Sequence, residues 1–396
     1  MLSFVGVAAI VISIALLPAA RCKDRTQYFM IILLLLAHLS VAMYYYRYTN
    51  HASADAWGYY YDPSNQYLRP FSVGTVPVFK LVHFLKVELQ ASYLDCFLLF
   101  QSIGLAGLVF LARVFKEIEE KLQVPDRRGY LGLLFLPTLL FWTAAIGKDA
   151  PLFFSISMLV WSILNLRQRF AYFCVAVGIM VLFRAHIALL AMTALAAAAF
   201  FERTGSLGRR LGLMMIAVVG IWLVIGPAQR TINFDETSVS SIATYVDEQQ
   251  SIYATAGGST AVVHAPLLVR IVSLLFRPFF FDAHGMLGLI PSIENIGTII
   301  AFVYAIGRWR EMAHLARRVF FVRFILIFAA ALLFSLALVY YNVGLGLRER
   351  VMAYPMILSS LVALWSFRRK LAHAAPRSRE DAVLSRSYAI RPAPES

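Results

Sequence analysis

Residues 319–341 read VFFVRFILIFAAALLFSLALVYY, a run that carries a single charged side chain, Arg323, near its beginning. At about 1.5 Å per residue, a helix of this length crosses a hydrocarbon layer roughly 30 Å thick. Arg323 is close enough to the start of the run to extend its guanidinium to the membrane surface, so it needs no functional explanation. This stretch therefore predicts a transmembrane α-helix.

Similar runs recur along the whole chain, which is 60% hydrophobic and only 15% charged. Soluble domains are usually about half apolar and about one quarter charged. We expect an all-α, polytopic membrane helix bundle over residues 1–370, followed by a disordered cytoplasmic tail at residues 371–396. The runs predict about eleven spans, near residues 1–20, 26–46, 91–113, 130–146, 151–166, 170–183, 187–201, 211–226, 291–307, 319–341 and 351–367.

The net charge of +14 is distributed in a way that argues against a nucleic-acid partner. Lys and Arg gather in every second connection between the predicted spans, which is the pattern of cytoplasmic loops. The N-terminus is therefore expected outside and the C-terminus in the cytoplasm. The basic connections lie near residues 21–25, 116–128, 167–169, 203–210, 308–318 and 368–370.

Two long connections are predicted to lie outside, at residues 47–90 and 227–290. In the first, residues 76–89 place cationic and imidazole side chains on one helical face and apolar side chains on the other. In the second, residues 266–281 are apolar except for one polar stripe, whereas residues 233–260 are polar and predict a mobile loop. Each connection therefore predicts one interfacial amphipathic helix.

Asp55 is the first candidate for chemistry, because it follows the second predicted span and lies close to the expected membrane surface. A carboxylate in that place can deprotonate an acceptor hydroxyl or hold a metal ion. A solvated loop aspartate would occupy the same position, so the residue alone leaves both interpretations open. We take Asp55 as the candidate catalytic residue, with the metal requirement unknown.

Five further residues are candidates for binding a phosphate group on the outer side. Lys148 breaks the charge pattern of the loops, although its turn would need polar residues anyway. Arg184 and His186 connect two predicted spans almost without a loop, where a charge usually faces a polar cavity. Arg348 and Arg350 precede the last span, and a planar guanidinium binds phosphate through two hydrogen bonds. A surface charge cluster is the alternative explanation for this pair.

Five more residues of the outer connections are candidates for binding a saccharide, because carboxylates, guanidinium groups and imidazoles hydrogen-bond to hydroxyls. These residues are Asp149, Arg277, Asp282, His284 and Glu294. The position of Glu294 near the start of a span is also explained by the helix dipole. A single Asp–His pair in a loop is a weak signal.

Four stretches resemble bacterial polytopic proteins of cell-surface polysaccharide synthesis, namely the GT-C-like membrane glycosyltransferases and the Wzy- or EpsG-like polymerases. They are Asp55 in the first outer loop, residues 136–149 (LPTLLFWTAAIGKD), residues 182–186 (LFRAH) and residues 342–350 (NVGLGLRER). The resemblance implies a bacterial inner-membrane protein that transfers a sugar or oligosaccharide from a polyprenyl-(di)phosphate carrier at the outer leaflet. The product would be exopolysaccharide, capsule or O-antigen.

In such proteins an acidic residue of the first outer loop serves the acceptor or a metal, and outer cations engage the lipid-linked phosphate. The resemblance gives these roles to Asp55 and to the phosphate-binding candidates. The chain lacks a soluble C-terminal domain and a paired Asp-x-Asp. No cofactor is therefore predicted with certainty, and a divalent cation stays open. The implied partners are the lipid bilayer, a polyprenyl-linked saccharide and other proteins of polysaccharide synthesis or export.

Three other functions remain open: a Wzy-type polymerase that joins repeat units, a non-enzymatic transporter or flippase of lipid-linked saccharide, and a structural partner within a synthase. A transporter is expected to carry charges deep in several broken helices. Here the charges gather on one side of the membrane instead, which favours catalysis.

Overall fold

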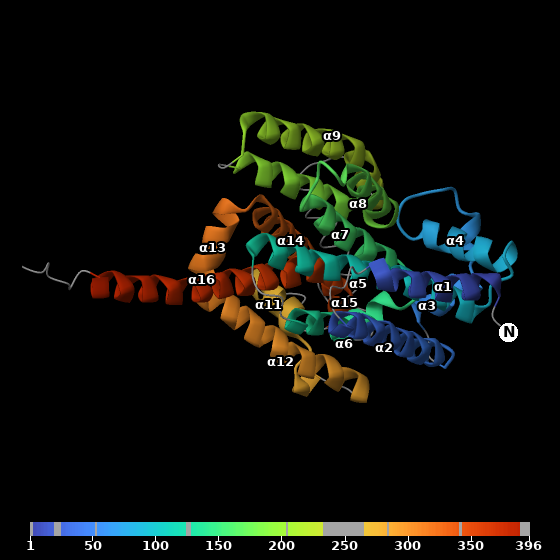
Figure 1. The fold of residues 1–396 in the computed structure, drawn as a ribbon. Helices are drawn as coiled ribbons and strands as arrows, with labels where there is room; N and C mark the ends of the chain where they lie inside the picture. Colours follow the sequence, from blue (N-terminus) through green and yellow to red (C-terminus); the bar gives the residue numbers. More distant parts are fainter. Residues whose placement is uncertain are drawn as a thin grey trace, which may run out of the picture.

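The computed structural model describes residues 3–19, 25–51, 54–123, 128–202, 205–232, 265–282, 285–339 and 343–388. Every regular element in this part of the chain is a helix (Figure 1). The α-helices are α1 (Phe4–Ala19), α2 (Arg25–Thr49), α3 (Asp55–Tyr61), α4 (Val76–Val87), α5 (Tyr93–Leu122), α6 (Pro137–Thr143), α7 (Asp149–Ile163), α8 (Phe170–Phe200), α9 (Leu207–Ile232), α11 (Leu267–Phe276), α12 (Gly285–Gly307), α13 (Trp309–Arg318), α14 (Phe320–Val339), α15 (Val343–Arg350) and α16 (Tyr354–Tyr388). Short 3-10 helices are η1 (Gln66–Leu68), η2 (Arg128–Phe135), η4 (Phe280–Asp282) and η5 (Val351–Ala353).

Among the described helices, seven are long and apolar enough to cross a membrane. These segments are Arg25–Thr49, Tyr93–Leu122, Phe170–Phe200, Leu207–Gln229, Gly288–Gly307, Phe320–Val339 and Val343–Ala372. The all-α class is confirmed, and the apolar helices indicate a membrane protein. The count of eleven spans and the orientation in the membrane stay predictions.

The prediction of one helix at residues 130–146 is wrong. The chain forms η2, then Leu136 with φ −57° and ψ 120°, and then α6, which begins at Pro137. A residue before proline disfavours the helical conformation, and proline itself is well suited to the first position of a helix. Residues 144–148 then lead without an α-helix into α7, so the turn before Asp149 lies where the predicted connection lay.

The predicted segments at residues 170–183 and 187–201 are the two helical halves of α8, which meet at Arg184, a residue with a non-helical backbone (φ −150°, ψ 79°). The first half of α8 packs on α7, and Arg169 at its beginning pairs with Glu117 near the end of α5. The second half packs on α14, and Glu202 just past its end pairs with Arg323 in the first turn of α14. The residues at the two ends of α8 therefore form ion pairs with residues near the ends of α5 and α14, far along the helix from Arg184.

The close packing of α5 in the centre of the bundle depends on small residues. A Cβ atom added at Gly104 would lie 2.0 Å from the Thr143 carbonyl oxygen, and one at Gly107 would lie 2.7 Å from the Phe153 ring. Small residues allow helix backbones to approach closely in membrane proteins. The end of α6, just before the turn that leads to Asp149, is thus pressed against α5.

The two predicted interfacial segments do form helices, α4 and α11, and their location at a membrane surface stays a prediction. The polar loop predicted at residues 233–260 lies outside the described residues. The backbone of α16 continues as a helix to Tyr388, and the disorder expected for residues 371–396 stays a prediction.

Candidate functional site

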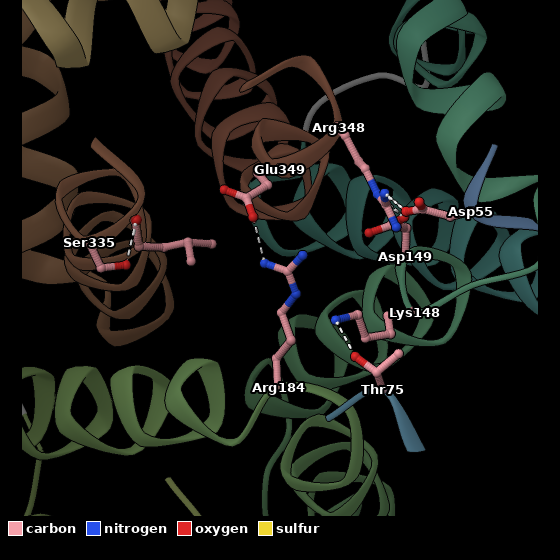
Figure 2. A network of polar contacts seen from close by, with 9 residues as sticks. Asp55, Thr75, Lys148, Asp149, Arg184, Ser335, Arg348 and Glu349 are labelled. Atoms are coloured by element: carbon pink, nitrogen blue, oxygen red, sulfur yellow. Dashed lines mark hydrogen bonds and ion pairs between the residues drawn. The ribbon is translucent and has the colours of Figure 1, made fainter. Parts of the chain in front are cut away.

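Three residues that are far apart in the sequence meet at one end of the bundle, and Arg348 is their centre (Figure 2). The Arg348 Nε atom donates to Asp149 Oδ2 at 2.5 Å, and its second guanidinium nitrogen donates to Asp55 Oδ2. The side chains of Arg348 and Asp149 are 14% and 8% exposed, whereas that of Asp55 is 61% exposed. Arg348 therefore bridges one enclosed carboxylate and one open carboxylate.

Local structure explains why both carboxylates stand at this place. Asp55 and Asp149 are the first residues of α3 and α7, where the positive end of the helix dipole stabilises a negative charge. Gly147, just before α7, has a φ of +157°, which L side chains rarely adopt. A Cβ there would also lie 3.5 Å from the Tyr59 ring. The glycine therefore allows the turn that brings Lys148 and Asp149 into the cluster.

A second ion pair lies beside the first. The break in α8 directs Arg184 toward α15, where its guanidinium pairs with Glu349 Oε1 at 2.9 Å (Figure 2). The two side chains are 12% and 13% exposed. Glu349 was not among the predicted site residues, although its place between two candidate arginines was a usable signal. Together, the two pairs join α8 and α7 to adjacent residues of α15.

Lys148 is the third cation of this cluster, and its ammonium group donates to the Thr75 hydroxyl at 3.2 Å. Burial and the positive charge of Arg184 lower the pKa of Lys148 to about 8, against the opposing effect of Asp149. The amide of Gly74 donates to the Leu182 carbonyl at 2.9 Å, so the first long connection is fixed to α8 at this point. The lysine is therefore close to losing its proton at mildly alkaline pH.

A cavity of about 720 Å³ opens beside Arg348, a volume that suits a small organic ligand. Asp55, Asp149 and Arg348 form its charged end, and residues of α2, α6 and α12 form its walls. Aromatic rings dominate those walls: Tyr44, Tyr45, Tyr48, Phe141 and Trp142. The Arg348 guanidinium lies 5.6 Å from the centre of the Trp142 ring. The cavity thus combines flat apolar surfaces with both signs of charge.

One acceptor at the charged end has no partner. Asp149 Oδ1 is buried and makes no hydrogen bond, while Oδ2 of the same carboxylate binds Arg348. Buried polar atoms are nearly always paired, so an unpaired one next to a cavity marks a place for a donor from a ligand or from water. The charged end of the cavity is therefore prepared to accept a hydroxyl or another N–H or O–H group.

Arg350 does not join Arg348 at the cavity. Its side chain is 1% exposed and donates to Asn295 Oδ1 at 2.7 Å and to the Leu275 carbonyl at 2.8 Å. Glu294 is also enclosed, accepting from the amide of Thr138 at 2.7 Å and from the Tyr354 hydroxyl at 2.8 Å. The structure thus separates the two arginines, which we had expected to act as a pair on one ligand.

The other candidates are also distributed away from the charged end. Asp282 binds Arg277 at 2.5 Å and accepts from the Phe279 amide, which closes the short turn after α11. His186 lies on α8 beyond the break and does not line the cavity, and His284 lies outside the described residues. In the described ranges, no three His, Cys, Asp or Glu side chains gather to form a metal site. The metal requirement stays open.

Comparisons of this chain with protein-family models, with curated proteins and with solved structures gave no match. The fold and the site themselves define its class: the described residues form an all-helical structure with seven helices apolar enough to cross a membrane and a charged, aromatic-lined cavity between α2, α6 and α12.

Proposed function

We propose that this protein is a membrane glycosyltransferase that moves a sugar or oligosaccharide from a polyprenyl-(di)phosphate carrier to an acceptor hydroxyl during cell-surface polysaccharide synthesis. The observation that carries the proposal is the meeting of Asp55, Asp149 and Arg348 at the charged end of an aromatic-lined cavity. Lys148 and Arg184 are two further cations close to this end; they pair with Thr75 and Glu349 and stand just outside the cavity lining. Saccharides favour aromatic faces with nearby carboxylates, and phosphates favour such cations.

In the proposed reaction, the acceptor oxygen attacks the anomeric carbon of the donor, and the bond from that carbon to the phosphate oxygen breaks. The lipid (di)phosphate leaves with the bonding electron pair, and the acceptor proton passes to Asp55. Arg348, Lys148 and Arg184 would stabilise the negative charge that develops on the leaving group. Asp149 Oδ1, the unpaired acceptor, would orient a hydroxyl of the sugar or of the acceptor.

The contact between Arg348 and Asp55 suggests how the base would be controlled. Asp55 is largely exposed, so its pairing with Arg348 is the weaker of the two and is the one that a donor phosphate can replace. When the phosphate binds Arg348, the Asp55 carboxylate would be released from this contact and could accept the proton of the acceptor hydroxyl. Proton removal would thus be favoured only when the donor is present.

The test is a deletion strain complemented with variants at equal protein levels, with polyprenyl-linked saccharides and polymer measured by mass spectrometry. Asp55→Asn is expected to abolish transfer while the protein still inserts normally. Asp62→Asn is the matched control, because Asp62 lies seven residues along the same loop and only accepts from the amides of Gln66 and Tyr67. Wild-type transfer by Asp55→Asn would remove the proposed base.

The same measurement separates the alternatives. A single-sugar transferase leaves material that lacks one residue, whereas a Wzy-type polymerase leaves complete but unjoined repeat units on the carrier. We favour transfer of one sugar, because the aromatic rings near Asp55 suit a compact acceptor site. A transporter or flippase would leave complete saccharides on the cytoplasmic side. The bacterial inner membrane, with the N-terminus outside and the C-terminus inside, is part of this proposal.

A further inference from the structure

The attachment of α12 to the rest of the bundle is unusual, because it depends on polar residues. Among the α12 side chains that the structure describes, the buried ones are Ser292, Glu294 and Asn295. Its apolar residues are largely exposed, such as Ile293 at 62% and Ile300 at 63%. Figure 1 shows α12 at the edge of the bundle, next to α6 and α11. Polar contacts are an established means of holding helices together in membranes.

The partners of these polar residues come from three other elements and centre on Arg350. Besides Asn295, the Arg350 guanidinium binds two carbonyls at the end of α11, those of Leu275 at 2.8 Å and Arg277 at 3.4 Å. It lies 3.8 Å from Glu294. The Glu294 carboxylate in turn accepts hydrogen bonds from the Tyr354 hydroxyl of α16 and from the backbone amide of Thr138, in the first turn of α6. One enclosed arginine thus connects α11, α12 and the α15–α16 segment.

This arrangement lies directly behind the wall of the cavity. Ile290 and Pro291 line the cavity from α12, one turn before Glu294. Thr138, whose amide binds Glu294, lines it from α6. Arg348 lies only two residues before Arg350 in α15. A displacement of the enclosed arginine would therefore move α12 and the charged end of the cavity together.

We propose that Arg350, through Asn295 and Glu294, is a positioning residue that sets the distance between the α12 wall and the α2 wall of the cavity and fixes Arg348 at its charged end. Arg350 itself touches no ligand in this role. A lysine cannot replace it, because a single ammonium group lacks the planar array of donors that reaches a side-chain oxygen and two carbonyls in different directions. This inference concerns the shape of the cavity and does not require that the reaction proposed above is correct.

The first experiment measures the width of the cavity by electron-paramagnetic-resonance distances between two spin labels. The labels are attached at Ser40→Cys on α2 and Ile290→Cys on α12, two residues that line the cavity from different helices. Three native cysteines are first replaced by alanine: Cys22, Cys96 and Cys174. The unperturbed chain is expected to give one narrow distance, and Arg350→Lys is expected to broaden it or add a second, longer distance.

Arg323→Lys is the matched control. Arg323 is likewise enclosed, pairs with Glu202 at 2.9 Å and donates to carbonyls at helix ends, but it lies at the remote end of α14. It is expected to leave the distance between the labels unchanged. An unchanged distance in Arg350→Lys, or equal broadening in Arg323→Lys, would overturn the inference.

Tyr354→Phe is a milder second variant in case Arg350→Lys does not fold. It removes only the hydroxyl that donates to Glu294, so it is expected to broaden the distance less. No broadening would count against the inference.

A binding measurement then connects the cavity shape to the proposed function, on which this second experiment rests. Polyprenyl phosphate serves as the probe, and its retention is followed by native mass spectrometry. Arg350→Lys is expected to retain less probe than the unperturbed chain, and Arg323→Lys the same amount; equal retention by both variants would contradict the positioning role. If the unperturbed chain retains none, the proposed carrier is wrong while the distance result still decides the inference.

Discussion

Asp55→Asn and Asp149→Asn remove the two carboxylates of the same arginine, yet we expect them to have opposite consequences. Asp149 is 8% exposed and binds a guanidinium that is 14% exposed, so its replacement leaves a mostly enclosed cation with one exposed partner. A hydrogen bond between charged, enclosed groups contributes about 1.5–3 kcal/mol. Exposed ion pairs contribute about 0–1 kcal/mol, which is the range expected for Asp55.

Asp149→Asn should therefore reduce the stability of the folded protein by about 2 kcal/mol, and Asp55→Asn by less than about 1 kcal/mol. A chain of 396 residues melts about 1 °C lower for each kcal/mol, so the first change should lower the melting temperature by roughly 2 °C. Thermal unfolding in detergent, followed by tryptophan fluorescence, measures both. Transfer activity should be lost in Asp55→Asn although its melting temperature is nearly unchanged.

A double variant tests the cause. In a chain that already carries Arg348→Leu, Asp149→Asn should lower the stability much less than it does alone, because the Asp149–Arg348 ion pair has already been removed. Equal melting temperatures of the two single variants, or full additivity in the double variant, would show that Asp149 is not the main anchor of Arg348.

Four further predictions concern Lys148, Gly104 and the orientation of the chain in the membrane. The pKa of Lys148 is lowered to about 8, so its positive charge is lost as the pH rises through 8, and retention of polyprenyl phosphate should fall there. Lys148→Arg should extend retention to higher pH. Retention that does not change with pH in the wild type would contradict the role of Lys148 in binding the phosphate. The same shift makes the folded state bind fewer protons than the unfolded state between about pH 8 and the ordinary lysine pKa of about 10.4, so this residue's contribution to stability should rise with pH over that range. Gly104→Ala should lower the melting temperature and the activity together, because its Cβ would meet the Thr143 carbonyl at 2.0 Å. An unchanged melting temperature would contradict the close packing of α5 on the end of α6. Reporter fusions near Ser241 and Gly346 should lie outside and a fusion at the C-terminus inside; an inside signal at either of the first two would contradict the proposed orientation.

Much of the cluster was predictable, because residues in connections on the same side of a membrane are brought to one end of a bundle. This reasoning pointed to Asp55, Lys148, Arg184 and Arg348 before any contact was known, and these residues do gather at one site. Asp149 was selected as a saccharide candidate, and its contact with Arg348 could not be foreseen. Which side chains pair depends on packing between segments that are about two hundred positions apart in the sequence.

The separation of Arg348 from Arg350 shows a different limit. The sequence around them was read as a short outer connection, in which neighbouring arginines could bind one ligand. In the structure they lie on a helix, α15, where residues two positions apart point in directions about 160° apart, to nearly opposite sides of the helix. A helix over this segment would have predicted that the two arginines lie on different sides, as they do: Arg348 lines the cavity and Arg350 is enclosed in the interior. The partners of the inner arginine still depend on tertiary packing.

The break of α8 at Arg184 has a consequence for the direction of every later segment. Asp149 and Arg348 touch, so in the proposed orientation, with both at the outer face, the chain between them crosses the membrane an even number of times. If α7, α9, α12 and α14 each cross once, a single passage by α8 would make the total odd and would leave the two residues on opposite faces. A return of the chain at Arg184 restores even parity. In the proposed orientation, the backbone of this one residue would therefore determine which face of the membrane Arg348 reaches, more than a hundred and fifty residues later.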